Sequence, residues 1–101
     1  MITMFNDGIL EATLYSNKWV FCRWVQNQHG KLQKKLIRDL NFIERMILDS
    51  KLAGWYTRSE EGHTAFHRLL EKFGCLPREV DGGFKWFVKP IIKEGDLHVR
   101  I

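Results

Sequence analysis

The feature that most constrains the fold is a long amphipathic stretch at residues 31–50. Apolar side chains recur along it at the spacing of one face of an α-helix. The residues of that face are Leu32, Leu36, Leu40, Ile43 and Ile47. A helix with one apolar stripe needs another layer of structure against which to bury it. The rest of the chain is therefore expected to supply a sheet.

A second, shorter helix is predicted at residues 63–73. Its apolar face is formed by Phe66, Leu69, Leu70 and Phe73. Gly74 follows this face and can adopt positive φ without steric cost, so it is predicted to end the helix. Residues 57–60 read Thr-Arg-Ser-Glu, which is a capping-box pattern expected ahead of the helix start.

The remaining apolar segments are rich in aromatic and β-branched residues, as strands are. Strands are predicted at residues 9–15, 19–26, 52–57, 84–88 and 97–101. The first two are expected to form a hairpin, and a turn at 81–83 precedes the fourth. In the fourth strand, Phe84, Trp86 and Val88 are expected to face the core. Lys85 and Lys89 are expected to face water.

The predicted order is therefore β-β-α-β-α-β-β, an α/β or α+β arrangement built on one sheet. The chain has 101 residues, of which 45% are hydrophobic and 28% charged. These values predict a single globular domain over residues 1–101. No apolar run approaches the roughly 20 residues that span a bilayer, and no secretory signal is visible. A cytoplasmic protein with no membrane partner is expected.

Cysteine and histidine content argues against disulfide and metal chemistry. Cys22 and Cys75 are too few and too far apart for a disulfide framework or a zinc site, so buried, reduced thiols are expected. His63 and His67 lie four residues apart on one predicted helix, but no HExxH pattern accompanies them. We therefore expect no metal.

The junction between the second predicted strand and the long helix is the best candidate for binding chemistry. Backbone N–H groups and the positive end of the helix dipole can hold a phosphate at such a place. The candidate cofactor-binding residues are Asn27, Gln28, His29, Gly30 and Lys31.

A basic cluster follows directly, and it consists of Lys31, Lys34, Lys35 and Arg38. No acidic residue precedes Asp39 in this helix, and the net charge of the chain is +4. Cations at a helix N-terminus oppose its dipole, so a bound anion would stabilise them. The cluster is therefore a candidate surface for a phosphate, a nucleic acid or an acidic protein partner. The alternative is a solvated basic face, since exposed charges are strongly screened.

Over residues 18–92 this order of elements resembles the later part of the GNAT superfamily of acyl-CoA N-acyltransferases. The family's pyrophosphate loop, [Gln/Arg]-x-x-Gly-x-[Gly/Ala], falls on residues 27–32. Gly30 matches, whereas Asn27 and Leu32 depart from the pattern. The resemblance implies a mixed, mostly antiparallel sheet with two helices. Because Leu32 is bulky where the pyrophosphate must approach, we expect no cofactor, with acetyl-CoA as the alternative.

The family's later pattern, Asn-x-x-Ala-x-x-x-Tyr-x-x-x-Gly-Phe, falls on residues 63–75, where only Gly74 matches. The tyrosine of this pattern often serves as general acid toward the departing thiolate. Leu70 stands at its position and cannot donate a proton. His67, one turn earlier, is the one weak candidate for a catalytic residue.

The pattern is nearest to small GNAT-like proteins of tailed phages, which include internal virion proteins. This resemblance implies a protein that binds a host factor or a virion component, or that forms a homodimer, without acetyl transfer. An acyl-CoA-dependent N-acetyltransferase is the alternative. A nucleic-acid-binding module is the second alternative, because aromatic and basic residues alternate at 84–89. Only residues 1–8 precede the first predicted strand, so docking is expected through the sheet region that the family's N-terminal helices cover.

Overall fold

A computed structural model of the protein describes residues 1–15, 18–24 and 33–92. Within these ranges the chain forms six strands and two helices. The strands are β1 (Ile2–Asn6), β2 (Leu10–Leu14), β3 (Trp19–Trp24), β4 (Gly54–Glu60), β5 (Leu76–Asp81) and β6 (Phe84–Pro90), and the helices are α1 (Gln33–Asp49) and α2 (Thr64–Lys72).

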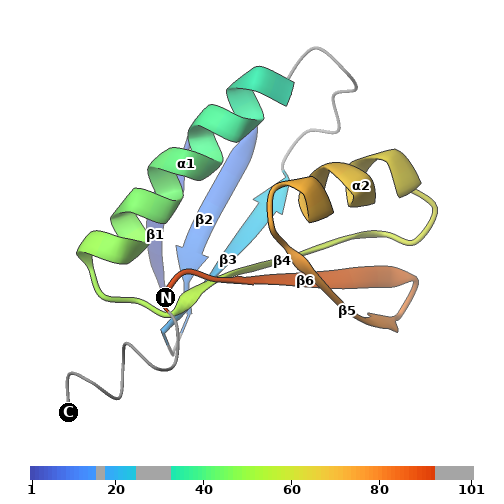
Figure 1. The fold of residues 1–101 in the computed structure, drawn as a ribbon. Helices are drawn as coiled ribbons and strands as arrows, with labels where there is room; N and C mark the ends of the chain where they lie inside the picture. The colour runs from blue at the N-terminus through green and yellow to red at the C-terminus, as the bar shows by residue number, and fades with distance from the viewer. Residues whose placement is uncertain (16–17, 25–32, 93–101) are drawn as a thin grey trace.

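The strands form one sheet in the order β1-β2-β3-β4-β6-β5 (Figure 1). Neighbouring strands are antiparallel except for β3 and β4, which run parallel. A parallel pair needs a crossover connection, and α1 provides it. The predicted mixed, mostly antiparallel sheet with two helices is therefore confirmed.

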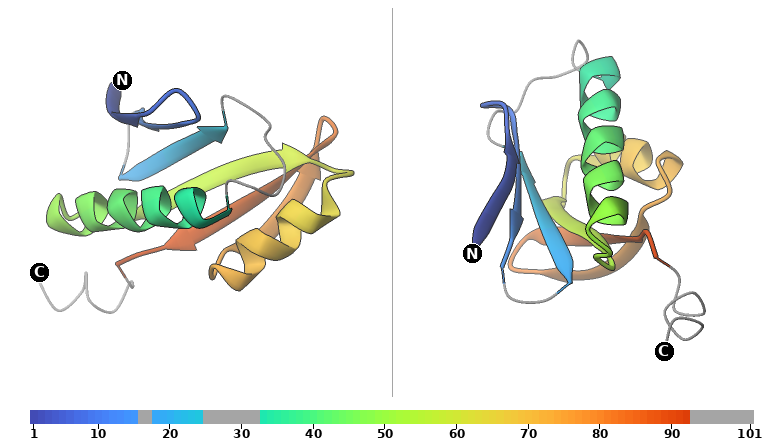
Figure 2. Two further views of the ribbon diagram at one scale, coloured as in Figure 1. Left: turned by 90° about the horizontal axis from the view of Figure 1, so that it is seen from above. Right: turned by 90° about the vertical axis from the view of Figure 1, so that its left-hand side faces the viewer.

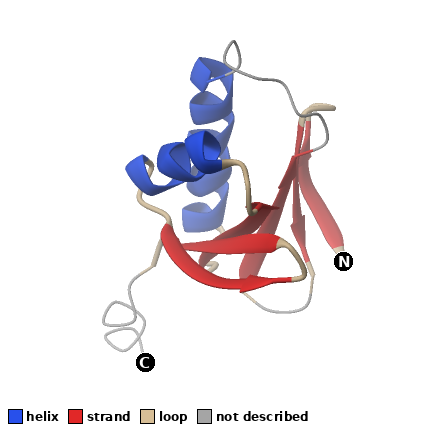
Figure 3. Ribbon diagram, turned by 90° about the vertical axis from the view of Figure 1, so that its right-hand side faces the viewer, coloured by secondary structure: helices blue, strands red, loops and turns tan. Residues whose placement is uncertain are grey.

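Both helices cover the same face of this sheet (Figures 2 and 3). The apolar stripe predicted for the long helix is buried at Leu40, Ile43 and Ile47, and α2 adds Leu70 to the same core cluster. Fully burying such a side chain stabilises the fold by about 1.5–3 kcal/mol. The two helices therefore share one core on one side of the sheet. We call the opposite side the open face.

The end of α2 is as predicted. Gly74 has φ of +97°, and its N–H donates to the Glu71 carbonyl oxygen at 3.0 Å. The N–H of Cys75 donates to the Leu70 carbonyl oxygen at 2.9 Å. This pair of bonds is a Schellman motif, which needs a left-handed residue at the position of Gly74.

Two local predictions are wrong, and one strand is not predicted. Residues 1–8 were expected to precede the first strand, but Ile2–Asn6 form β1, which pairs with β2. Residues 57–60 belong to β4 and do not cap α2, whose N-cap is His63 without a side-chain cap hydrogen bond. Leu76–Asp81 form β5, an exposed edge strand that the sequence does not predict. The strand predicted at 97–101 lies outside the described residues.

The facing predicted for β6 is also wrong. Phe87 is the residue of this strand that enters the core, at 1% exposure, and its ring centroid lies 5.2 Å from that of His67 on α2. Lys89 points to the same side and reaches Glu44 on α1. By strand alternation, Phe84 and Trp86 then lie on the open face. The predicted alternation has the correct period of two residues, but the side of β6 that faces the core is the opposite one.

Candidate functional site

The strands β3 and β4 pair only over a short length. Their register couples Trp19 with Gly54, and the last described pair joins Phe21 to Tyr56. One residue further along β3, the Cys22 carbonyl oxygen accepts a hydrogen bond from Thr57 Oγ1 at 2.7 Å. A side chain thus replaces the backbone ladder where the two strands part. In the described part of the chain, no backbone pairing joins the end of β3 to β4.

Two polar atoms near this divergence are buried without a hydrogen-bond partner among the described residues. They are Trp24 Nε1, at the end of β3, and His67 Nε2, on α2. The Trp24 ring meets Phe66, the neighbour of His67, edge-on at 5.0 Å between centroids. Leaving a buried polar atom unpaired costs about 1–3 kcal/mol. Both atoms therefore belong to residues at or next to the contact between Trp24 and Phe66.

His67 is 7% exposed, and burial lowers the pKa of its imidazole. The nearby charge of Lys85 lowers this pKa further, whereas a hydrogen bond with the Glu60 backbone raises it. The imidazole is consequently neutral at pH 7. The structure places the candidate catalytic residue at the junction of α2, β4 and β6.

The other side chains of this region are inert. Leu70, at the position of the family's general acid, is a core residue at 1% exposure. Cys22 and Cys75 are buried and not bonded to each other, as predicted. Burial raises the pKa of the Cys75 thiol to about 12 and raises that of Cys22 as well. Neither thiol is a thiolate nucleophile at neutral pH.

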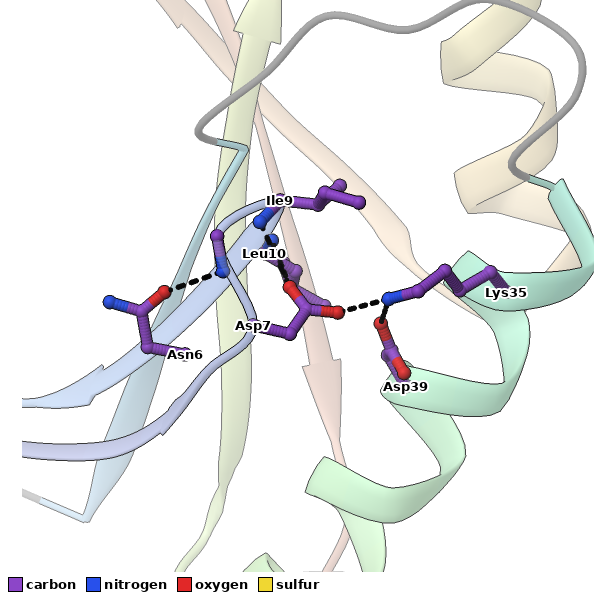
Figure 4. A network of polar contacts seen from close by, with 7 residues as sticks. Asn6, Asp7, Ile9, Leu10, Lys35 and Asp39 are labelled. Atoms are coloured by element: carbon purple, nitrogen blue, oxygen red, sulfur yellow. Dashed lines mark hydrogen bonds and ion pairs between the residues drawn. The ribbon is translucent and has the colours of Figure 1, made fainter.

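Lys35, from the predicted basic cluster, is held by two carboxylates of the protein itself. Its Nζ donates to Asp7, in the turn between β1 and β2, and to Asp39 at 3.1 Å (Figure 4). Asp7 also accepts the N–H groups of Ile9 and Leu10 at 2.9 and 2.8 Å. Burial opposes ionisation of Asp7, but these hydrogen bonds outweigh it and hold its pKa well below the ordinary value. Lys35 therefore joins α1 to the turn after β1.

Lys34 and Arg38 remain exposed and make no ion pair within the described ranges. The structure thus leaves two of the four predicted anion-binding cations available. The fourth, Lys31, lies outside the described residues. So do the other predicted cofactor-binding residues, Asn27, Gln28, His29 and Gly30.

The open face carries a group of aromatic side chains that the sequence reasoning did not bring together. A shallow depression of about 310 Å³ is lined by Tyr15, Phe21, Tyr56, Arg58 and Trp86. Four of these residues come from β3, β4 and β6, and Tyr15 directly follows β2. The alternation of these residues within each strand is visible in the sequence. The sequence does not show which side of the sheet the helices cover.

Metal and membrane features are lacking in the described part of the chain. No group of three His, Cys, Asp or Glu side chains there is placed to hold a metal ion. Neither α1 nor α2 is long and apolar enough to cross a bilayer.

Comparison with known proteins gives a match of fold. The sequence matches no protein-family profile and no protein with a curated description. The structure is similar to the crystal structure of a Klebsiella pneumoniae subsp. pneumoniae protein provisionally named an acyl-CoA N-acyltransferase, with a TM-score of 0.62 and 16% sequence identity. The match covers 82% of this chain, which spans 62% of the other. The chain therefore has a GNAT-like fold, and at this identity the similarity is one of fold alone.

Proposed function

We propose that this acyltransferase-like fold acts by binding a partner on the open face of its sheet, without acetyl transfer. The observation that carries the proposal is the grouping of Phe21, Tyr56 and Trp86 with Arg58, which strand alternation places on the side of the sheet opposite the helices. The three aromatic side chains are half-buried and Arg58 is exposed, and a contiguous apolar patch with a polar rim is typical of an interaction site. Tyr, Trp and Arg are also the side chains enriched at binding hot spots.

The chemistry around α2 supports a binding role over a catalytic one. Leu70 fills the position of the general acid and is part of the core. The thiols are buried with raised pKa values. On α1, outside this region, Lys35 is neutralised by Asp7 and Asp39. Within the described residues, His67 is the remaining candidate for proton transfer in this region.

Acyl-CoA-dependent N-acetyl transfer is the second candidate function. It is favoured by the parting of β3 from β4 and by the unpaired Nε2 of His67. In that reading His67 would handle the proton of the departing thiolate, and residues 27–31 would hold the pyrophosphate. A neutral imidazole can accept a proton as a general base, whereas protonating a thiolate needs the imidazolium form, which the burial of His67 disfavours.

Titration calorimetry with acetyl-CoA at low salt separates the two candidates. If the binding proposal is correct, the titration should detect no complex with a dissociation constant in the low micromolar range. Such a constant corresponds to a binding free energy of about −8 kcal/mol. Tight binding of acetyl-CoA, together with acetylated product whose formation is lost in His67→Gln, would establish the enzyme and refute the proposal. Product formation unaffected by His67→Gln would leave His67 without a catalytic role.

The resemblance to small proteins of tailed phages adds a setting to the proposal. In the host cytoplasm the protein would inhibit a defence or regulatory protein, and in a particle it would be a virion component. Both settings need a binding surface, and neither needs a catalytic group.

Sedimentation at micromolar concentration tests whether the partner is a second copy, because a homodimer through the open face would dissociate in Trp86→Ala and persist in Phe42→Ala. Phe42 is an exposed aromatic residue of α1, on the helical side.

A further inference from the structure

We infer that the open face binds single-stranded nucleic acid, by stacking bases on Phe21, Tyr56 and Trp86 and by pairing a phosphate with Arg58. These three aromatic residues are called the ring cluster below. The inference rests on the proposed binding function of this face and names its partner by chemical class.

The ring cluster is one continuous aromatic surface. Its members come from three successive strands of the sheet, β3, β4 and β6. The Phe21 and Tyr56 centroids are 5.2 Å apart, and each lies 6.2 Å from Trp86. The ring planes are inclined to one another by only 31–38°. Aromatic side chains on a sheet face are platforms on which successive bases stack, whatever the sequence of the strand.

Arg58 brings a positive charge to the edge of this platform. Its guanidinium carbon lies 4.5 Å from the Phe84 ring centroid and 5.6 Å from that of Trp86, so it packs on aromatic faces. The side chain is exposed, and no carboxylate of the described residues forms an ion pair with it. A guanidinium held in this way presents planar donors that match a phosphate.

The acidic residues nearby do not cancel this charge. Glu11 projects on the open face, but it forms an ion pair with Arg23 at 3.5 Å. Glu60, at the end of β4, lies 3.5 Å from His63, which offsets its charge only when the imidazole is protonated, but it forms no ion pair with Arg58. The chain as a whole carries a net charge of +4, which attracts a polyanion from a distance. Arg58 is therefore a cation of the open face that no carboxylate of the described residues pairs.

A nucleotide unit satisfies both parts of this surface at once. An apolar protein surface would cover the rings, but it would leave Arg58 desolvated without an acceptor, which is costly. The depression of about 310 Å³ is shallow, and its volume is at the lower limit of ligand pockets. Such a site does not enclose a free nucleotide. It suits an extended strand that continues beyond it.

The test is fluorescence anisotropy with the full chain and a labelled single-stranded oligothymidylate of about 12 nucleotides, at several salt concentrations. We expect binding that Trp86→Ala weakens by about fivefold or more, because base–aromatic stacking is worth about 1–3 kcal/mol per base. Trp86→Phe retains a ring and should retain most of the affinity. Circular dichroism confirms that each variant is folded.

Arg58→Ala provides a second readout, which is the salt dependence of binding. Losing one phosphate contact should reduce the slope of log K against log salt by about 0.7 for a single strand. The matched control is Arg45→Ala, which removes the same charge from the exposed helical side. It should leave the slope unchanged. Lys34→Ala serves to exclude binding at the start of α1.

The inference is overturned if the oligonucleotide does not bind at low salt, or if it binds Trp86→Ala and Arg58→Ala as tightly as the wild type. Loss of binding in Lys34→Ala alone would move the contact to α1 and also overturn it. Equal affinity for thymidine monophosphate and the oligonucleotide would show a nucleotide pocket in place of a strand site. If a protein partner is captured in a Trp86-dependent way while the oligonucleotide is not bound, the proposed binding function stands and this inference falls.

Discussion

Replacing Glu44 by alanine should destabilise the protein much more than replacing it by glutamine. Glu44 projects from α1 toward the sheet, where its Oε2 accepts a hydrogen bond from Trp55 Nε1 at 2.8 Å. The same carboxylate lies 2.9 Å from Nζ of Lys89, on β6. Trp55 is fully buried, whereas the side chains of Glu44 and Lys89 are 18% and 21% exposed. One side chain therefore connects the helix to two strands.

The magnitude follows from these two contacts. Without an acceptor, the buried indole N–H of Trp55 should cost about 1–3 kcal/mol. The ion pair with Lys89 is partly solvated, so its loss should cost about 1 kcal/mol. Glu44→Ala loses both contacts, and we expect a loss of about 2–4 kcal/mol. Glu44→Gln keeps an oxygen acceptor for Trp55, and we expect about 1 kcal/mol.

Urea unfolding at pH 7 measures both variants. Glu71→Ala, at an exposed position of α2, corrects for the change in helix propensity. Lys89→Met combined with Glu44→Gln should cost less than the sum of the single changes, because the two residues interact directly. Equal losses in Glu44→Ala and Glu44→Gln would show that the indole hydrogen bond contributes nothing and would refute the reasoning.

Three further predictions concern other buried groups. Gly54→Ala should lower stability by about 1–3 kcal/mol in thermal unfolding, because the new Cβ would lie 2.3 Å from a carbonyl oxygen of β6. Gly62→Ala is the control and should change stability little, because Gly62 lies in open space. Cys22 and Cys75 should react with a thiol reagent at pH 8 only in denaturant, since burial raises both pKa values; rapid labelling of the folded protein would contradict this. Burial lowers the pKa of His67 in the folded protein. As the pH falls below about 6.5, this imidazole is therefore protonated in the unfolded chain before it is protonated in the folded protein. Stability to urea should therefore decrease from pH 7 to pH 5, and less so in His67→Gln.

The helices could be predicted from the sequence because their signals are local. The apolar spacing at 31–50 gave a helix that the described residues place at Gln33–Asp49. Gly74 marked the end of α2 because a left-handed position is steric and depends on one residue. The hairpin of β2 and β3 was likewise predictable from two adjacent apolar segments.

The facing of β6 could not be predicted because a period of two has two solutions. Aromatic residues occupy both sides of the strand, with Phe84 and Trp86 on one side and Phe87 on the other. The larger number of aromatic residues suggested the wrong side. The position of α2, which covers Phe87, decides the matter, and that is a property of the whole fold.

The candidate site was hidden for a related reason. Asp7 neutralises Lys35 from 28 positions away in the chain, so the basic cluster looked more uniform than it is. The ring cluster draws one residue from each of three strands, and no single segment contains its pattern. By contrast, β5 was missed because an exposed edge strand has no buried side to produce alternation.

The short parallel pairing of β3 with β4 has a consequence for the order of folding. On one side of it β1, β2 and β3 are joined by antiparallel hairpins, and on the other β5 and β6 form a hairpin. Contacts close in sequence form early, whereas the β3–β4 pairing must first close a loop that contains α1. Its last described pair, Phe21 with Tyr56, also supplies two members of the ring cluster. A ligand stacked across both rings would hold the two parts of the sheet together, and the bound protein would unfold more slowly than the free one.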